Sequence, residues 1–151
     1  MRVFFSKKCD IGIKAVLFLS IQEKNQKISA DTISNELNEP REFISKTLQE
    51  LTKSKIVASR KGKDGGFYLN KEASEIRLID IIAAIDGLDV FKECVLGFSG
   101  CNIETPCPVH DTWGPIRERA YKLFSTQTLE DLKEKTEVKI YSIKNNLRNK
   151  K

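Results

Sequence analysis

The residues best suited to chemistry lie in one loop in the second half of the chain. Cys94, Cys101 and Cys107 are followed by His110, the only histidine, in the spacing C-x6-C-x5-C-x2-H. Two glycines and two prolines bend the intervening backbone, so the four side chains can converge on one centre without regular structure. Thiolate and imidazole donors hold iron–sulfur clusters or zinc, and the spacing does not separate the two. The loop is a candidate metal centre.

Other interpretations of these residues remain open. His110 stands at an expected helix start, where it could serve as a cap or hydrogen-bonding group. The spacing is also close to that of C-x8-C-x5-C-x3-H zinc fingers that bind RNA, although the first and last gaps are shorter here. The fourth cysteine, Cys9, is expected to pack as a small apolar residue. The sequence contains no second histidine, nucleophile–base pair or phosphate loop, so we expect no enzyme; a small Fe–S carrier or metalloenzyme is the less favoured alternative.

Length and composition limit the class of protein. A chain of 151 residues can form one domain with an appended element. It contains no apolar run of the roughly 18 to 20 residues that cross a bilayer, so we expect a cytoplasmic protein without a membrane partner. The first 70 residues carry 13 basic and 8 acidic side chains, whereas residues 71–151 carry 13 of each. This excess of positive charge favours a polyanion-binding first half, although a solvated lysine-rich surface would look the same.

Apolar periodicity predicts three helices in the first third of the chain. Asp10 is a possible N-cap for the first helix, and Ser29 or Asp31 for the second. The helices are expected within residues 10–24, 28–38 and 39–55. The inward stripe of the third helix is expected to comprise Phe43, Ile44, Leu48 and Leu51.

A β-hairpin is expected next. The β-prone runs 56–60 and 67–70 flank a basic, glycine-rich turn, and Asp64-Gly65 is a strong hairpin signal. Three helices followed by a hairpin are in the order of a winged helix-turn-helix, whose third helix lies in the major groove of DNA. Base edges could be read by Arg41, Ser45, Lys46 and Gln49. Phosphates or the minor groove could be reached by Arg60, Lys61 and Lys63.

The second half of the chain adds helices around the cysteine loop. Residues 76–87 form an expected fourth helix with Ile79, Ile82 and Ala83 inward, and residues 111–127 a fifth. The apolar seam of the fifth helix is interpreted as a dimerisation surface, with packing on the fourth helix as the alternative; it comprises Trp113, Ile116, Ala120, Leu123 and Phe124. The expected fold is mainly α with a small β-hairpin: a winged helix-turn-helix domain (1–86), a cluster-binding loop (87–110), a dimerisation helix region (111–134) and a basic C-terminal tail (135–151). The Lys/Asn-rich end of this tail, residues 145–151, is expected to be frayed.

These segments carry a family resemblance. The stretches "IGIKAVLFLS" and "ISADTISNELNEPREFISKTLQELTKSKIVASRKGKDGGFYLNKEASEIRLIDIIAAIDG" resemble the bacterial winged-helix regulators that include IscR, NsrR and CymR. The hallmark of that family is a wing of the form S-x-R/K-G-x-x-G-G-Y/F-x-L, which "SRKGKDGGFYL" matches. The resemblance covers roughly residues 3–133. It implies homodimers that bind near-palindromic promoter DNA and respond to cluster status, nitric oxide, redox state or a metabolic signal.

The resemblance also bears on the metal centre. IscR-like members bind a 2Fe–2S cluster through three cysteines and a histidine, and Cys94, Cys101, Cys107 and His110 fall on those places. The first gap is one residue longer than in the family pattern. NsrR-like members take the fourth ligand from an aspartate at the start of the first helix, across the dimer, and Asp10 falls there. A 2Fe–2S cluster is therefore favoured over 4Fe–4S, with zinc or thiol chemistry as the alternative for members without a cluster.

Overall fold

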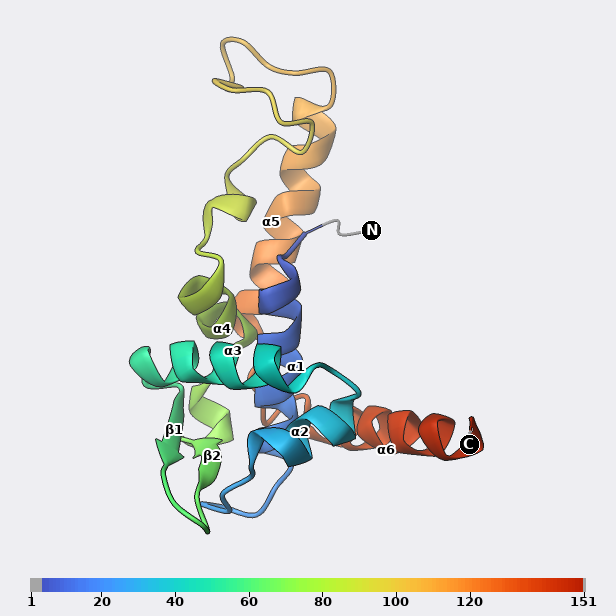
Figure 1. The fold of residues 1–151 in the computed structure, drawn as a ribbon. Coiled ribbons are helices and arrows are strands. Elements are labelled where there is room, and N and C mark those ends of the chain that lie inside the picture. The colour runs from blue at the N-terminus through green and yellow to red at the C-terminus, as the bar shows by residue number, and fades with distance from the viewer. Residues whose placement is uncertain (1–3, 151) are drawn as a thin grey trace.

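The computed structural model describes residues 4–150 and confirms a mainly helical fold with one hairpin (Figure 1). The ends of the expected DNA-binding domain and tail, residues 1–3 and 151, lie outside the described part. No helix within that part is long and apolar enough to cross a membrane. The helices are α1 (Lys7–Ser20), α2 (Ala30–Leu37), α3 (Arg41–Lys53), α4 (Leu78–Ile85), α5 (His110–Thr126) and α6 (Lys133–Asn149), with short 3-10 turns η1 (Ala73–Glu75) and η2 (Asp89–Phe91); the strands are β1 (Val57–Arg60) and β2 (Gly66–Leu69).

Helix α1 lies at the centre of the core and begins earlier than expected. Ser6 is its N-cap, because the Ser6 hydroxyl accepts a hydrogen bond from the Cys9 amide at 3.0 Å. The prediction of Asp10 as the cap was wrong: Asp10 lies in the first turn, where its negative charge favours the helix dipole. At Gly12 a Cβ atom would lie 2.4 Å from Ile85 Cδ1, so the missing side chain lets α4 approach α1 closely.

Helix α3 packs on α1 through a stripe that differs in part from the expected one. Ile44, Leu48 and Leu51 are fully buried as predicted, and Thr47 is buried beside them. The inward assignment of Phe43 was wrong, since its side chain is 51% exposed. On a helix, residue 43 lies about 100° away from residue 44, so the core can take one of the two and leave the other in solvent.

The wing is a two-stranded antiparallel hairpin in which Val57 pairs with Leu69 and Arg60 with Gly66. A third backbone segment pairs with β2 near the turn: Ile28 and Phe67 exchange two amide–carbonyl hydrogen bonds of 2.9 and 2.8 Å. Burial of Phe67 anchors the returning strand in the core. The wing is therefore tied to the segment that leads into α2.

Replacing Gly66 with alanine is expected to destabilise the protein by about 2–3 kcal/mol. The added Cβ would lie 2.6 Å from the carbonyl carbon and oxygen of Ile28, and backbone cannot move aside as a side chain can. Gly62→Ala is the matched control, because Gly62 also has a positive φ but no atom within 4 Å of the added Cβ. Urea unfolding measures both, and an equal loss in the two variants would contradict the steric argument.

After the wing, α4 and η2 carry the chain towards the cysteine loop, and α5 returns from the loop to the body (Figure 1). Ile79 and Ile82 of α4 are buried as predicted, together with Leu78 and Ile81. The inward assignment of Ala83 was wrong, since it is exposed. The cysteine loop joins η2 to the start of α5 at the end of the molecule opposite the wing.

The C-terminal region is ordered rather than frayed. Residues 133–149 form α6, which packs on α1 and α2 through buried Thr136 and Ile140. The frayed tail expected from the Lys/Asn-rich composition is therefore wrong. Between α5 and α6, fully buried Leu129 donates its backbone N–H to the Ile76 carbonyl at 2.9 Å, which fixes the end of α5 to the segment before α4.

Candidate metal centre and nucleic-acid interface

The structure brings the three predicted cysteines together. The Sγ atoms of Cys94, Cys101 and Cys107 all lie within 4.8 Å of one another. Cys94 and Cys107 are closest, with 3.4 Å between their sulfurs. Among residues 4–150 this is the one group of three or more histidine, cysteine or acidic side chains with such convergence. Three soft donors at this separation suit iron–sulfur or zinc chemistry.

His110 joins this group through one cysteine. Its Nδ1 atom lies 3.2 Å from Cys101 Sγ, at the first residue of α5. The Cys101 sulfur also accepts a hydrogen bond of 3.3 Å from the Cys107 amide. The predicted fourth ligand thus contacts one of the three cysteines and is not itself a member of the converging group. Asp10, the alternative fourth ligand, is not a member of the group within this chain.

Local hydrogen bonding gives the thiols of the loop different pKa values. Burial acts to raise the pKa of Cys94, but hydrogen bonds from the backbone of Phe98 and Leu96 and with the other two thiols outweigh it and lower the pKa to about 7. The pKa of Cys107 is raised, mainly by burial. Cys9, outside the loop, is fully buried and has its pKa raised to about 12 by burial and the nearby Asp86 carboxylate.

Metal-free, reduced protein is expected to be alkylated first at Cys94. The thiolate is the reactive form, so the Cys94 rate should rise with pH through about 7 and level off above it. Cys107 should react only at higher pH, and Cys9 only after unfolding. Iodoacetamide labelling followed by peptide mass spectrometry measures each site. Equal rates at Cys94 and Cys107 at neutral pH would contradict this order.

The surroundings of the cysteines also suit an anionic sulfur-rich group. A cavity of about 60 Å³ is lined by the three cysteines and His110 together with Lys92, Trp113 and Arg117. The Trp113 Nε1 atom is buried and has no hydrogen-bond partner. A buried N–H without an acceptor is costly, and a cluster or thiolate sulfur would supply one. Lys92 and Arg117 also place two positive charges in the lining, which suits a group with negative charge. The residues present therefore fit an iron–sulfur cluster, and they fit zinc through the same donor set.

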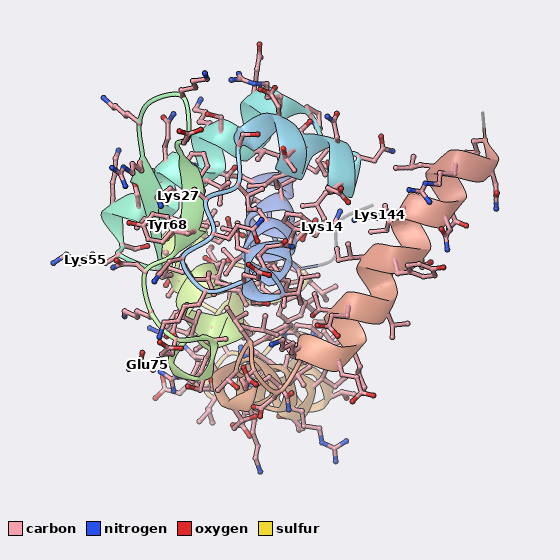
Figure 2. All side chains as sticks on the ribbon, turned by 90° about the horizontal axis from the view of Figure 1, so that it is seen from below. Lys14, Lys27, Lys55, Tyr68, Glu75 and Lys144 are labelled. Atoms are coloured by element: carbon pink, nitrogen blue, oxygen red, sulfur yellow. The ribbon has the colours of Figure 1, made fainter. Side chains whose placement is uncertain are left out.

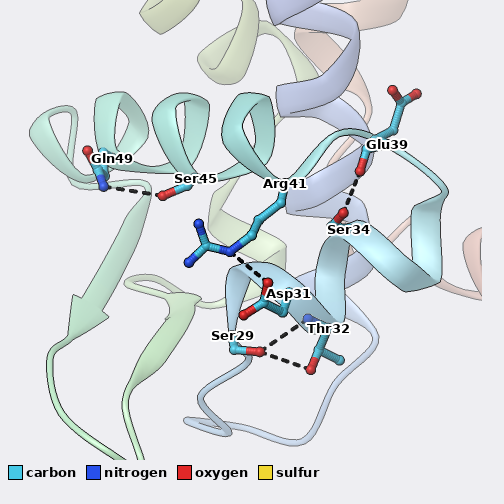
Figure 3. A network of polar contacts seen from close by, with 8 residues as sticks. All are labelled: Ser29, Asp31, Thr32, Ser34, Glu39, Arg41, Ser45 and Gln49. Carbon is cyan, nitrogen blue, oxygen red and sulfur yellow. Dashed lines mark hydrogen bonds and ion pairs between the residues drawn. The ribbon is translucent and has the colours of Figure 1, made fainter.

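Three of the predicted base-reading residues, Arg41, Ser45 and Gln49, lie along one side of α3 (Figure 3), where Arg41 and Gln49 are exposed and Ser45 is half-buried. Arg41 forms an ion pair of 2.6 Å with Asp31 at the start of α2. The Gln49 side-chain amide donates to the Ser45 hydroxyl at 3.3 Å. Both contacts are exposed, so DNA can replace them at little cost. Lys46 lies on the same helix, exposed and with no ion pair in the described part of the chain.

The wing offers further free cations. Arg60, Lys61 and Lys63 are exposed, and none of them forms an ion pair within residues 4–150.

Phe43 was missed as a candidate for this interface. Its exposed ring stands one turn ahead of Lys46 on α3, where an apolar side chain can contact a thymine methyl group. The sequence could have indicated Phe43, because it is an aromatic residue within an otherwise polar helix face.

The apolar seam of α5 divides into two faces. Phe124 packs within its own chain, and its ring centroid lies 5.2 Å from that of Phe5. Ala120 packs on the same cluster. Ala120 and Phe124, both in the predicted dimer seam, therefore contact Phe5 and Phe91 of the same chain on this side of the helix, and their role in a dimer stays a prediction. Trp113 is half-buried against Phe4. Ile116 and Leu123 remain 51% and 52% exposed.

Known proteins with similar sequences and folds are transcriptional regulators. The chain is 29% identical over 132 residues to an HTH-type transcriptional regulator of Aquifex aeolicus, covering 86% of this chain and 91% of that protein. It is 27% identical to the regulator NsrR of Oceanobacillus iheyensis, covering 83% and 86%. The fold resembles CymR, the global cysteine regulator of B. subtilis, with a TM-score of 0.73 at 21% identity, covering 88% and 98%.

A family model covers most of the chain as well. Residues 5–135 match Rrf2, described as an iron-dependent transcriptional regulator. This range includes the winged helix, the cysteine loop and α5, and it ends within the first turn of α6. The protein therefore belongs to the Rrf2 family of DNA-binding transcriptional regulators, which are not enzymes.

Proposed function

We propose that the protein is a cytoplasmic, homodimeric regulator whose promoter binding is controlled by an iron–sulfur cluster, 2Fe–2S rather than 4Fe–4S. The convergence of three cysteine sulfurs within 4.8 Å carries this proposal, with His110 as the fourth ligand. When bound, such a cluster supplies a group whose loss or oxidation follows redox state, nitric oxide or cluster supply. The α3 face and the wing bind promoter DNA, with Arg41, Ser45, Lys46 and Gln49 at bases and Arg60, Lys61 and Lys63 at phosphates.

The backbone connects the centre to the DNA-binding surface. His110 is both a proposed ligand and the first residue of α5. At the other end of α5, the Gln127 carbonyl accepts a hydrogen bond of 3.1 Å from the Leu78 amide at the start of α4. Ligation therefore orders the loop and sets the direction of α5, which fixes the distance between the two recognition helices of the dimer. A coupling of about 1–3 kcal/mol is enough to change promoter occupancy.

Zinc or thiol chemistry is the second candidate for control. The observation that favours it is the 3.4 Å between Cys94 and Cys107 sulfurs, together with the lowered pKa of Cys94. In this case the same loop would order through zinc, or change by oxidation of two thiols.

Anaerobic purification followed by iron, sulfide and zinc analysis separates these candidates. We expect a coloured protein with iron and sulfide in near-equal amounts, whose affinity for selected promoter DNA at fixed salt differs between the cluster-loaded and metal-free forms. A colourless protein with stoichiometric zinc, or with no metal after reconstitution, would overturn the cluster. Equal affinities of the two forms on every selected duplex would overturn the control.

A further inference from the structure

The positive charge of the chain is concentrated in two places. The first lies in residues 1–70, with the winged helix. The second is the C-terminal segment 133–151, which carries seven basic and two acidic side chains. The intervening residues 71–132 carry six basic and eleven acidic side chains. The family match ends at residue 135, so most of the second basic region lies outside the matched residues.

Packing places this second region beside the helix-turn-helix. Buried Thr136 and Ile140 hold α6 against α1 and α2. Lys144 forms an ion pair of 2.7 Å with Glu36 in the last turn of α2, a short way before the recognition helix begins at Arg41. Figure 1 shows α6 extending sideways from the body next to α2. In the view from below, its C-terminal end projects beyond the body at the level of α2 and α3 (Figure 2).

The other basic side chains of α6, and that of Lys150 at its C-cap, are not held in ion pairs within residues 4–150. Five basic residues are exposed and form no ion pair in the described part of the chain: Lys133, Lys135, Lys139, Arg148 and Lys150. Arg148 stands about one turn beyond Lys144, toward the projecting end. Lys133 is different, because it borders a hollow with Glu72, Glu75 and Glu130. The uncompensated charge therefore increases toward the C-terminal end of the helix.

We propose that α6 is a second DNA-contacting element, which binds backbone phosphates outside the half-site read by α3 and the wing. The proposal rests on the proposed function, since those elements must first place the protein on a duplex. Lysine and arginine on an exposed helix contact phosphates without reading bases. Helix α6 accordingly adds affinity and salt dependence, and lengthens the DNA segment that is needed for full binding, without changing the preferred sequence.

The test compares two double variants with the same loss of charge. Arg148→Gln with Lys150→Gln removes the cations at the projecting end. Lys133→Gln with Lys135→Gln removes two at the start of the same helix, one of them beside acidic residues. Neither pair touches the buried Thr136 and Ile140, so circular dichroism and thermal unfolding should match the wild type. The probe is a duplex recovered from a random-sequence library by selection with wild-type protein, used at full length and trimmed to the half-sites.

On the full-length duplex we expect the distal variant to bind about 5- to 50-fold more weakly at low salt, and its plot of log affinity against log salt to be less steep by about 1–2. On the trimmed duplex it should equal the wild type, because the flanking phosphates are absent. The proximal variant should match the wild type on both. Two results would overturn the proposal for α6 while leaving the proposed function intact. One is an unchanged salt dependence of the distal variant on the long duplex, and the other is a loss of affinity that persists on the trimmed duplex. Failure of the wild type to select any duplex would overturn the proposed function as well.

Discussion

Replacing Cys101 with alanine is expected to abolish metal binding by the purified protein. The Cys101 sulfur is in contact with His110 Nδ1 and with the Cys107 amide, so its loss removes one of the four proposed donors and disturbs two of the remaining three, His110 and Cys107. The effect on metal affinity should exceed the 10–100-fold that loss of an outer-shell partner costs. Iron, sulfide and zinc analysis after anaerobic purification, with a visible absorption spectrum, measures the result.

Cys9→Ala is the control for this experiment. Cys9 is a cysteine of the same chain, but it is fully buried on α1 and lies outside the converging group. This variant should keep the metal content of the wild type. Wild-type iron or zinc in Cys101→Ala would contradict the site, as would loss of metal from Cys9→Ala.

Replacing Ile116 and Leu123 together with glutamine is expected to convert the proposed dimer into monomers. Both side chains are about half exposed on the face of α5 that Phe5 and Phe91 leave free, and burying amides there without partners is costly. A monomer binds each half-site separately, so affinity for a selected palindrome should fall by at least about 100-fold. Sedimentation velocity and a DNA titration at one salt concentration measure the two effects.

Val138→Gln with Tyr141→Gln is the matched control. These residues are also apolar and exposed, at 68% each, but they lie on α6. The control should sediment as the wild type does. If it also dissociates, or if the α5 variant remains dimeric, α5 is not the dimer surface.

The sequence predicted most of the fold because its strongest signals are local. The order of three helices and a basic hairpin, together with the match of "SRKGKDGGFYL" to a family wing, is enough to indicate the winged helix. The three cysteines were also predictable, since soft donors in a loop rich in glycine and proline have few other uses. The structure adds the separation of their pKa values, which depends on hydrogen bonds from Phe98 and Leu96 that no pattern reveals.

The errors arose where two neighbouring residues compete for one role. Ser6 and Asp10 can both cap a helix, and tertiary structure decided between them, because Asp86 accepts hydrogen bonds from the Ser6 amide and hydroxyl. Phe43 and Ile44 can both face a core, and in the structure Ile44 is buried whereas Phe43 is exposed.

The C-terminal helix was missed for a different reason. Its apolar residues recur at helical spacing, with Thr136, Ile140 and Ile143 on the side that packs against the core. The many lysines and asparagines around them make the segment polar on average, and this average conceals the periodicity.

The cysteine loop has a small attachment to the rest of the molecule, and this has a consequence for how such regulators diversify. Arg117 holds the entry to the loop by donating hydrogen bonds to the carbonyls of Lys92 and Glu93, and the loop lies at the end of the molecule opposite the wing. Under the proposed function, substitutions within the loop therefore change the stimulus without altering the operator that α3 reads. In the proposed arrangement, separate parts of the chain determine the stimulus and the DNA sequence that is bound. An engineer could therefore exchange one while keeping the other.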